Sequence, residues 1–280
     1  TCYAIGVINL IATSMCIAYL ALATDPQWPL FIAANRDEAH ARPTRPAAPW
    51  PNQPDIYGGL DLEAGGTWFA IHKNGRFALL TNHRNLRLAS PEKPRSRGFL
   101  CKDFVESQMT PNTYLEQIQS QAKQYAGFNL IVGQWHTDLA RFECYYYSNQ
   151  LSQPPQALAP GYYILSNDFL NTPWPKSQRL ADRLTHHLQS GGFKESEEVF
   201  TILKDNTPAP DHLLPDTGLD LARERLVSSP FIINPEYGTR SSSIWAVDKN
   251  GRSILHECSY NPEGIETQRH SWPLSLFTTL

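Results

Sequence analysis

The order of apolar runs and turns along the chain predicts an α+β fold with antiparallel sheets. Strand-like runs gather toward both ends of the 280 residues, and helical patterns gather in the middle. Asn74-Gly75 and Asn250-Gly251 each lie between β-rich segments, and Asn-Gly is a strong hairpin signal. No GxGxxG or P-loop pattern indicates alternating βαβ units instead.

Short apolar runs bounded by turn residues predict the strands. The predicted strands span residues 16–23, 30–34, 67–72, 77–81, 128–132, 139–147, 162–166, 242–247 and 253–258. The turn-rich residues 24–29 join the first two into a hairpin. Residues 42–54 carry so many prolines that they are expected to form a surface loop, because proline fixes φ and has no backbone N–H.

Helices are predicted over residues 102–108, 112–125, 175–189 and 195–204. The third has the clearest pattern. It starts with Pro175, where a helix tolerates proline, and Leu180, Leu184 and Leu188 follow at intervals of four. Gly191-Gly192 then ends it.

Composition narrows the class of protein. A 41% hydrophobic content lets 280 residues bury one large core, although length alone would also allow two domains. We expect a single domain over residues 15–280, with residues 1–14 as an upstream extension. A net charge of -3 without a basic stripe argues against nucleic acid as a partner.

Cysteine usage indicates the compartment. The five cysteines are widely spaced, odd in number and without a CxxC pair, so they suggest neither a zinc site nor a disulfide framework. We therefore expect reduced thiols in the cytoplasm. No apolar run approaches the roughly 18 residues of a membrane-spanning helix, so neither export nor membrane insertion is expected.

A series of short motifs runs through the chain from Met15 onward. They are Met15-Cys16-Ile17, Asn35-Arg36-Asp37-Glu38, Arg42-Pro43-Thr44, Gly65-Gly66-Thr67-Trp68, Leu80-Thr81-Asn82 with Arg84, Ser96-Arg97-Gly98, Gly127-Phe128-Asn129-Leu130, Leu165-Ser166-Asn167, Thr172-Pro173-Trp174-Pro175-Lys176 and Tyr237-Gly238-Thr239-Arg240-Ser241-Ser242. In this order they resemble the NRDE family, also called the transport and Golgi organisation protein 2 family. That family is similar to cysteine N-terminal-nucleophile hydrolases such as bile-salt hydrolases and penicillin V acylases. The resemblance implies a four-layer αββα sandwich of two antiparallel sheets, with amide hydrolysis as the ancestral chemistry.

In such hydrolases the N-terminal cysteine supplies both nucleophile and base. Its thiol attacks an amide carbonyl while its own α-amine takes the proton, and the resemblance places this role on Cys16. An α-amine titrates near ~7.7 to 8.0 and a thiol near ~8.5, so a neighbouring cation can populate the thiolate at neutral pH. Arg36 and Arg240 are the candidates for that cation.

The resemblance also assigns the remaining catalytic positions. Asp37 matches the acidic residue beside the nucleophile's amine, and Arg240 matches the late active-site arginine. Asn82 and Asn167 match donors to the oxyanion or the substrate carbonyl, and each follows a strand-like run.

Asn35 and Arg36 are further candidates, but here the chain departs from the hydrolases, in which an arginine lies three positions before the aspartate. Alternation along a strand predicts that Asn35 and Asp37 share one face. Arg36 then either reaches around a bend or forms a structural ion pair with Glu38 or Asp61.

Residues before Cys16 would block its amine, because a peptide nitrogen is not a base. Three explanations remain open: Met15 is the true initiator, the chain is processed at this point, or Cys16 does no such chemistry. We favour the first, because a Met-Cys junction normally permits removal of the initiator.

Two functions of different classes follow from the resemblance. The first is a cysteine amidohydrolase that acts on a small amide, needs no cofactor or metal and forms an acyl-enzyme at Cys16. The second is a protein that binds and traffics haem or a lipid or acyl ligand without cleaving it, since eukaryotic relatives are linked to haem mobilisation and lipid metabolism.

Overall fold

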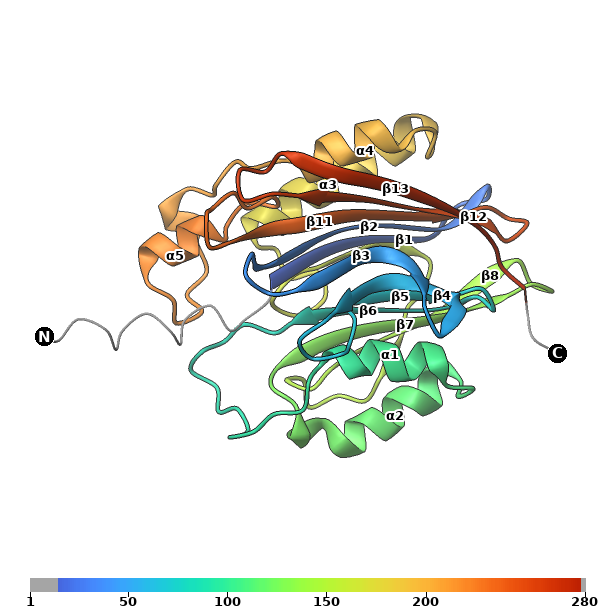
Figure 1. Ribbon diagram of the computed structural model, residues 1–280, viewed down its shortest axis with the longest axis horizontal. Coiled ribbons are helices and arrows are strands. Elements are labelled where there is room, and N and C mark those ends of the chain that lie inside the picture. Colours follow the sequence, from blue (N-terminus) through green and yellow to red (C-terminus); the bar gives the residue numbers. More distant parts are fainter. Residues whose placement is uncertain (1–14, 278–280) are drawn as a thin grey trace, which may run out of the picture.

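The computed structural model describes residues 15–277, which form two antiparallel sheets packed face to face between two pairs of helices (Figure 1). The first sheet has the strand order β10-β1-β2-β11-β12-β13, and the second has the order β3-β4-β5-β6-β7-β8-β9. Helices α3 and α4 cover the outer face of the first sheet, and α1 and α2 cover that of the second. The four-layer αββα sandwich implied by the resemblance is therefore confirmed.

The first sheet consists of β1 (Met15–Asp25), β2 (Trp28–Ala39), β10 (Gly161–Leu165), β11 (Tyr237–Val247), β12 (Arg252–Tyr260) and β13 (Glu266–Ser275). The second consists of β3 (Thr44–Trp50), β4 (Gln53–Asp61), β5 (Phe69–His72), β6 (Arg76–Asn82), β7 (Phe128–His136), β8 (Arg141–Ser148) and β9 (Gln156–Ala157). The helices are α1 (Gly98–Glu106), α2 (Pro111–Gln121), α3 (Pro175–Gly191), α4 (Ser196–Leu203), α5 (Leu221–Leu226) and the 3₁₀ turns η1 (Ala122–Gln124) and η2 (Asp211–Leu213). Within residues 15–277, no helix combines the length and apolar character needed to cross a membrane.

The side chains of β1 alternate between two apolar layers, as strand geometry requires. Ala18, Leu20 and Leu22 point into the layer between the two sheets. Ile17, Tyr19 and Ala21 instead pack in the layer beneath α3 and α4. The same alternation places the Cys16 side chain on the face that looks toward the second sheet.

The three predicted hairpins are confirmed, as are the helix that starts at Pro175 and the strands β7, β8 and β10. The α1 helix starts at Gly98, four residues before the predicted residue 102, and Gly98 packs backbone to backbone against Gly66 at this start. The edge strand β13 was not predicted, because most of its side chains are exposed and give no apolar pattern.

The prediction of a loop over residues 42–54 was wrong, since this segment contains β3 and the start of β4. Among the described strands, β3 lies at the edge of its sheet and pairs with β4 alone, with register shifts between Arg45 and Ala48 and between Pro49 and Trp50. An edge strand tolerates proline, because one side of its backbone needs no ladder partner.

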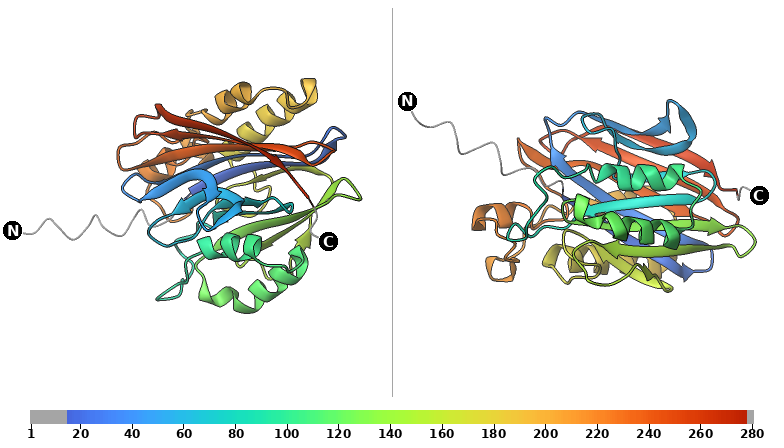
Figure 2. Two further views of the ribbon diagram at one scale, coloured as in Figure 1. Left: turned by 45° about the vertical axis from the view of Figure 1, so that its right-hand side comes forward. Right: turned by 90° about the horizontal axis from the view of Figure 1, so that it is seen from below.

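Antiparallel pairing brings several strand ends to one end of the sandwich. The start of β1 lies beside the end of β2, and the start of β11 adjoins it on the other side. The end of β10 lies beside the start of β1, and the residues at the ends of β6 and β10 meet in the Asn167–Asn82 hydrogen bond. The segment around α5 lies at the same end of the sandwich (Figures 1 and 2). Residues far apart in sequence therefore meet there, and we call this region the site end.

Candidate functional site

Cys16 lies at the start of β1 with 7% of its surface exposed. In the β1–β2 pairing it is directly opposite Arg36. Directly opposite residues of an antiparallel pair have Cβ atoms about 4.5–5.5 Å apart and point to the same face. The thiol and the guanidinium group are therefore neighbours between the two sheets.

A cleft of about 490 Å³ opens at the site end. A smaller cavity lined by Cys16 shares Arg36, Trp68 and Leu80 with the wall of this cleft. The charged residues that line the cleft are the arginines Arg36, Arg42, Arg95 and Arg97 and the acids Glu38, Asp61 and Glu63. Cys16 thus borders a polar cleft and is not enclosed by hydrocarbon alone.

Arg36 is buried and joins both cavities. Its Nη2 lies 3.5 Å from Glu38 Oε2, and its guanidinium carbon lies 4.1 Å from the centroid of the Trp68 ring. Its Nη1 is buried and makes no hydrogen bond to any residue in the described part of the chain. The expected ion pair with Glu38 is present, and Arg36 faces the same way as Cys16 without a bend in the strand.

Asp37 lies across from residue 15 in the same pairing, on the opposite face of β2 from Arg36. It is fully buried, and its Oδ1 accepts a hydrogen bond of 2.6 Å from Thr239. Burial raises the pKa of this carboxyl to about 7, while Lys176, the Thr239 bond and Arg36 act in the opposite direction. The carboxyl lies at the strand position where it adjoins the Met15–Cys16 peptide.

Asn82 and Asn167 are brought together from the ends of β6 and β10. Asn167 Nδ2 donates to the Asn82 carbonyl at 3.2 Å, and the Asn167 carbonyl accepts from the Arg84 backbone N–H at 2.6 Å. Both asparagines are buried, and Asn82 lines the cleft. The prediction that strand ends carry the two amides to a shared region agrees with this arrangement.

Lys176 is a member of this cluster to which the sequence gave no role. It is 2% exposed, and its Nζ donates to Asn167 Oδ1 at 3.3 Å and to the Val227 carbonyl at 3.1 Å. Burial lowers the pKa of its ammonium group to about 8, and Arg84 adds to this, whereas Asp37 and Cys16 raise it. Lys176 therefore lies within electrostatic reach of both the thiol and the buried carboxyl.

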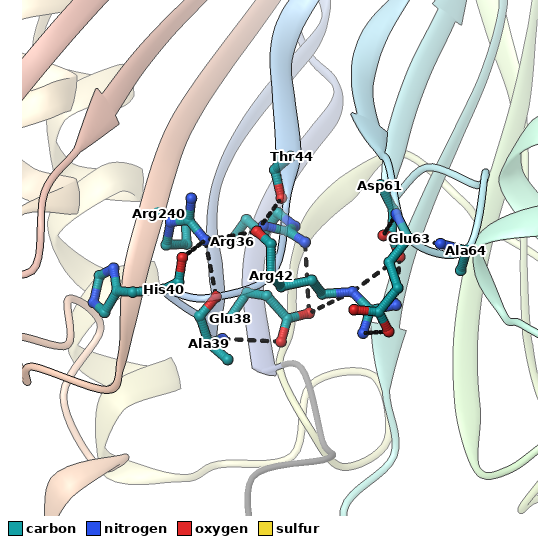
Figure 3. A network of polar contacts seen from close by, with 10 residues as sticks. All are labelled: Arg36, Glu38, Ala39, His40, Arg42, Thr44, Asp61, Glu63, Ala64 and Arg240. Carbon is teal, nitrogen blue, oxygen red and sulfur yellow. Dashed lines mark hydrogen bonds and ion pairs between the residues drawn. The ribbon is translucent and has the colours of Figure 1, made fainter.

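Arg240 is placed at a β-bulge between Thr239 and Ser241, where β11 pairs with β2. Bulges often re-aim a side chain next to a functional site. The Arg240 Nη1 donates to the carbonyls of Ala39 at 2.8 Å, His40 at 3.2 Å and Arg42 at 3.2 Å (Figure 3). Arg240 thus fixes the chain where it leaves β2 and begins the cleft wall.

Arg42 continues this wall through three carboxylates. Its guanidinium group lies 2.7 Å from Asp61, 3.0 Å from Glu63 and 3.8 Å from Glu38 (Figure 3). This network ties the end of β2 to the end of β4 and the turn that follows it. The polar rim of the cleft is therefore held by ion pairs between segments of both sheets.

Asn35 lies on the same face of β2 as Asp37, as the strand alternation predicted, but its bonds lead away from the cleft. Its Nδ2 donates to the carbonyls of Leu203 at 2.9 Å and Pro230 at 2.8 Å, and its Oδ1 accepts from Ser242 at 2.6 Å. These bonds fasten β2 to the end of α4, to the segment after α5 and to β11. The structure thus gathers the other candidates at the site end, whereas Asn35, which also lines the small cavity beside Cys16, directs its side-chain bonds into the framework.

The predictions about the upstream extension concern residues 1–14, which lie outside the described residues. Within residues 15–277, no group of three or more His, Cys, Asp or Glu side chains is arranged to hold a metal ion.

Comparison with known proteins gives the family. The family model for Transport and Golgi organisation 2 matches residues 15–262. The Transport and Golgi organization protein 2 homolog of Bos taurus is 32% identical over 277 residues, covering 93% of this chain and 99% of the relative. The homolog of Mus musculus is 32% identical over 261 residues, covering 88% and 93%.

Two solved structures also align with the chain. An N-acylethanolamine-hydrolyzing acid amidase ortholog of Caenorhabditis elegans is 10% identical with a TM-score of 0.46, over 84% of this chain and 93% of that one. The C2A mutant of a conjugated bile acid hydrolase from Clostridium perfringens is 9% identical with a TM-score of 0.41, over 92% of each chain. From the family match and the curated relatives together, the chain belongs to the Transport and Golgi organisation 2 family.

Proposed function

We propose that this chain is a cysteine amidohydrolase that cleaves a small amide through an acyl-enzyme at Cys16. The observation that carries the proposal is the position of the Cys16 thiol, opposite Arg36 and in a cavity that shares three wall residues with the cleft. A guanidinium group beside a thiol favours the thiolate, which is the nucleophilic form.

The reaction follows from the groups present. The Cys16 sulfur attacks the amide carbonyl carbon, and the unblocked α-amine of the same residue takes the thiol proton. The C–N bond then breaks, the amine passes that proton to the leaving nitrogen, and a thioester remains on Cys16. Water, deprotonated by the α-amine, releases the carboxylic acid and restores the thiol. Asp37 would hold the amine, and Asn82 and Asn167 would donate to the oxyanion.

The active form must begin at Cys16, because the amine serves as the base. The family match starts at residue 15, one position before the nucleophile, which supports an active chain that begins there. N-terminal sequencing of protein made in its native host tests this point. Persistence of residue 15 or of earlier residues on active protein would exclude the α-amine as the base.

Trapping the acyl-enzyme tests the chemistry. Protein that begins at Cys16 is incubated with a panel of activated acyl amides and then analysed by intact-mass and peptide mass spectrometry. The proposal predicts a single acyl adduct on Cys16 that disappears with turnover, and no adduct in Cys16→Ala. Turnover that survives in Cys16→Ala would contradict it.

Ligand binding without cleavage is the second candidate function, with haem or a lipid or acyl compound as the ligand. The cleft favours it in one respect. Arg97 donates to the Gly127 carbonyl at 2.9 Å and forms no ion pair with a carboxylate of residues 15–277, while Trp68 adds an aromatic wall. Burial lowers the Arg97 pKa only to about 10, so its guanidinium group stays charged at neutral pH and would suit an acidic ligand.

Haem titration separates the two functions. A stoichiometric Soret shift that is lost in Arg97→Met and is accompanied by no acyl-enzyme would favour binding. Featureless binding that survives the substitution would leave hydrolysis as the better account.

A further inference from the structure

A buried lysine is costly to keep, because its ammonium group loses its hydration on folding. Lys176 lies in the first turn of α3, is 2% exposed, and yet ends beside the asparagine proposed to hold the oxyanion. An apolar side chain of similar length would fill the same space without that cost. Its position therefore calls for a role in the site.

The contact with Asn167 has a definite consequence for the amide. An ammonium group has three donors and no acceptor, so the group 3.3 Å from Nζ must be the amide oxygen. Lys176 thus holds Asn167 with its oxygen toward the lysine and its NH₂ turned away. One N–H of that NH₂ donates to the Asn82 carbonyl, so the orientation of Asn167 is coupled to that of Asn82 in the cleft wall.

Charged groups surround Lys176 from several elements. Asp37 on β2, Cys16 on β1 and Glu224 on α5 raise the pKa of its ammonium group, whereas burial and Arg84 after β6 lower it. Arg84 is itself paired with Glu224 at 3.1 Å. Asp37 and the Cys16 thiol are therefore the main groups that stabilise the Lys176 cation.

We propose that Lys176 is a positioning residue of the Cys16 site: its ammonium group orients the Asn167 amide and, together with the guanidinium groups of Arg36 and Arg97, supplies the positive charge that stabilises the Cys16 thiolate. The inference deepens the proposed hydrolytic function and rests on it for what the thiolate does next. The charge effect itself exists with or without turnover.

The test is the pH profile of alkylation of Cys16 by iodoacetamide, followed by peptide mass spectrometry so that the other cysteines do not interfere. Lys176→Met removes the charge and retains most of the volume, and Lys176→Arg retains the charge. Lys249→Met is the matched control, because Lys249 is exposed in the β11–β12 turn, at the opposite end of β11 from Arg240.

The alkylation midpoint of Lys176→Met should move up by about one pH unit, which makes the reaction about tenfold slower at pH 7. Asp37 interacts directly with Lys176 and has a pKa of about 7, so its protonation offsets part of the lost charge, and a shift of about one unit is what remains. Lys176→Arg and Lys249→Met should keep the midpoint of the unsubstituted protein. An unchanged midpoint in folded Lys176→Met would overturn the proposal.

A second measurement leaves Lys176 in place, in case Lys176→Met does not fold. The lysine side chains are labelled with ¹³C, and the resonance of Lys176 is titrated by NMR in the parent protein and in Cys16→Ser. Because coupling between two titrating sites is reciprocal, loss of the thiolate should lower the titration midpoint of Lys176. An identical midpoint in both proteins would reject the charge coupling.

Neither measurement needs a substrate. If an acyl-enzyme forms but Lys176 and Cys16 show no charge coupling, Lys176 has no part in the mechanism and the proposed hydrolysis stands. Coupling without any acyl-enzyme would keep the lysine in the site and reject hydrolysis.

Discussion

Two parts of the β1–β2 hairpin use the same backbone pairing for opposite purposes. In the middle of the hairpin Leu20 pairs with Ile32, and both fill the apolar layer between the sheets. Four residues earlier in β1, Cys16 pairs with Arg36 in the same layer. The layer between the sheets is therefore apolar in the middle of the hairpin and contains a thiol and a guanidinium group at the site end.

This difference indicates which part of the sandwich stabilises the fold and which part carries the functional groups. Buried polar side chains are concentrated at the site end, and they include Arg36, Asp37, Glu38, Asn82, Arg84, Asn167, Lys176 and Glu224. Buried charges are weak contributors to stability, whereas apolar burial stabilises. The middle of the sandwich should thus supply stability, and the site end should supply chemistry at a cost in stability.

Substitutions at Cys16 and Leu20 should separate the two parts most strongly. Cys16→Ala should reduce turnover to background and change the free energy of unfolding by less than about 1.5 kcal/mol. Leu20→Ala should cost about 2–5 kcal/mol of that free energy and keep turnover per folded molecule. Urea unfolding and acyl-amide assays on both variants measure this, and a reversed pattern would show that Cys16 holds the fold and Leu20 serves the reaction.

The Arg84–Glu224 pair tests whether charge burial is costly when a partner is lost. Glu224→Ala removes the carboxylate from beside buried Arg84, so we expect a loss of about 3–5 kcal/mol in unfolding free energy. Asp216→Ala breaks the exposed Arg87–Asp216 pair and should leave the denaturation midpoint nearly unchanged. Equal effects of the two substitutions would contradict the argument.

Asp37 should give the stability of the protein a particular pH dependence. Its folded pKa is about 7, above the value of about 3.9 in an unfolded chain. The folded state therefore holds a proton that the unfolded state has lost in this window, so this contribution to stability falls as pH rises from about 4 to about 7. In Asp37→Asn the contribution is absent. The unfolding free energy of the variant should therefore rise relative to that of the parent between pH 4 and pH 7. A constant difference would show that the carboxyl titrates normally.

The smallest effect is expected at Arg240, which acts on the cleft wall through backbone carbonyls. Arg240→Met should raise KM by about tenfold and lower kcat less, since it loosens substrate-binding residues and not the nucleophile. Steady-state kinetics on an amide that forms the acyl-enzyme measures the two constants. A loss confined to kcat would instead place Arg240 at the reacting atoms.

Local signals predicted the hairpins and the helix at Pro175, because turn chemistry and apolar spacing are properties of neighbouring residues. They failed over residues 42–54, where the position of β3 at a sheet edge makes proline acceptable. Edge position is a property of the whole sheet and leaves no mark in the segment itself.

The site shows the same division. Strand alternation predicted that Asn35 and Asp37 share a face, and the family motifs supplied Cys16, Asn82 and Asn167. The register that pairs Cys16 with Arg36 is set by the two strands together and cannot be read from one of them. For this reason the adjacency of Arg36 and Asp37 was interpreted as a departure from the hydrolases. Lys176 was overlooked because the first turn of a helix usually faces water, and only the docking of α3 onto the sheets buries it.

The proposed hydrolysis requires that Cys16 act with its own α-amine beside the cleft. Two forms of the chain test it directly, one that begins at Cys16 and one that retains residues 1–15. The rate of acylation of Cys16 by the same acyl amide is measured for each by intact-mass spectrometry. We expect acylation of the first form and none above background in the second; equal rates in the two forms would exclude the α-amine as the base.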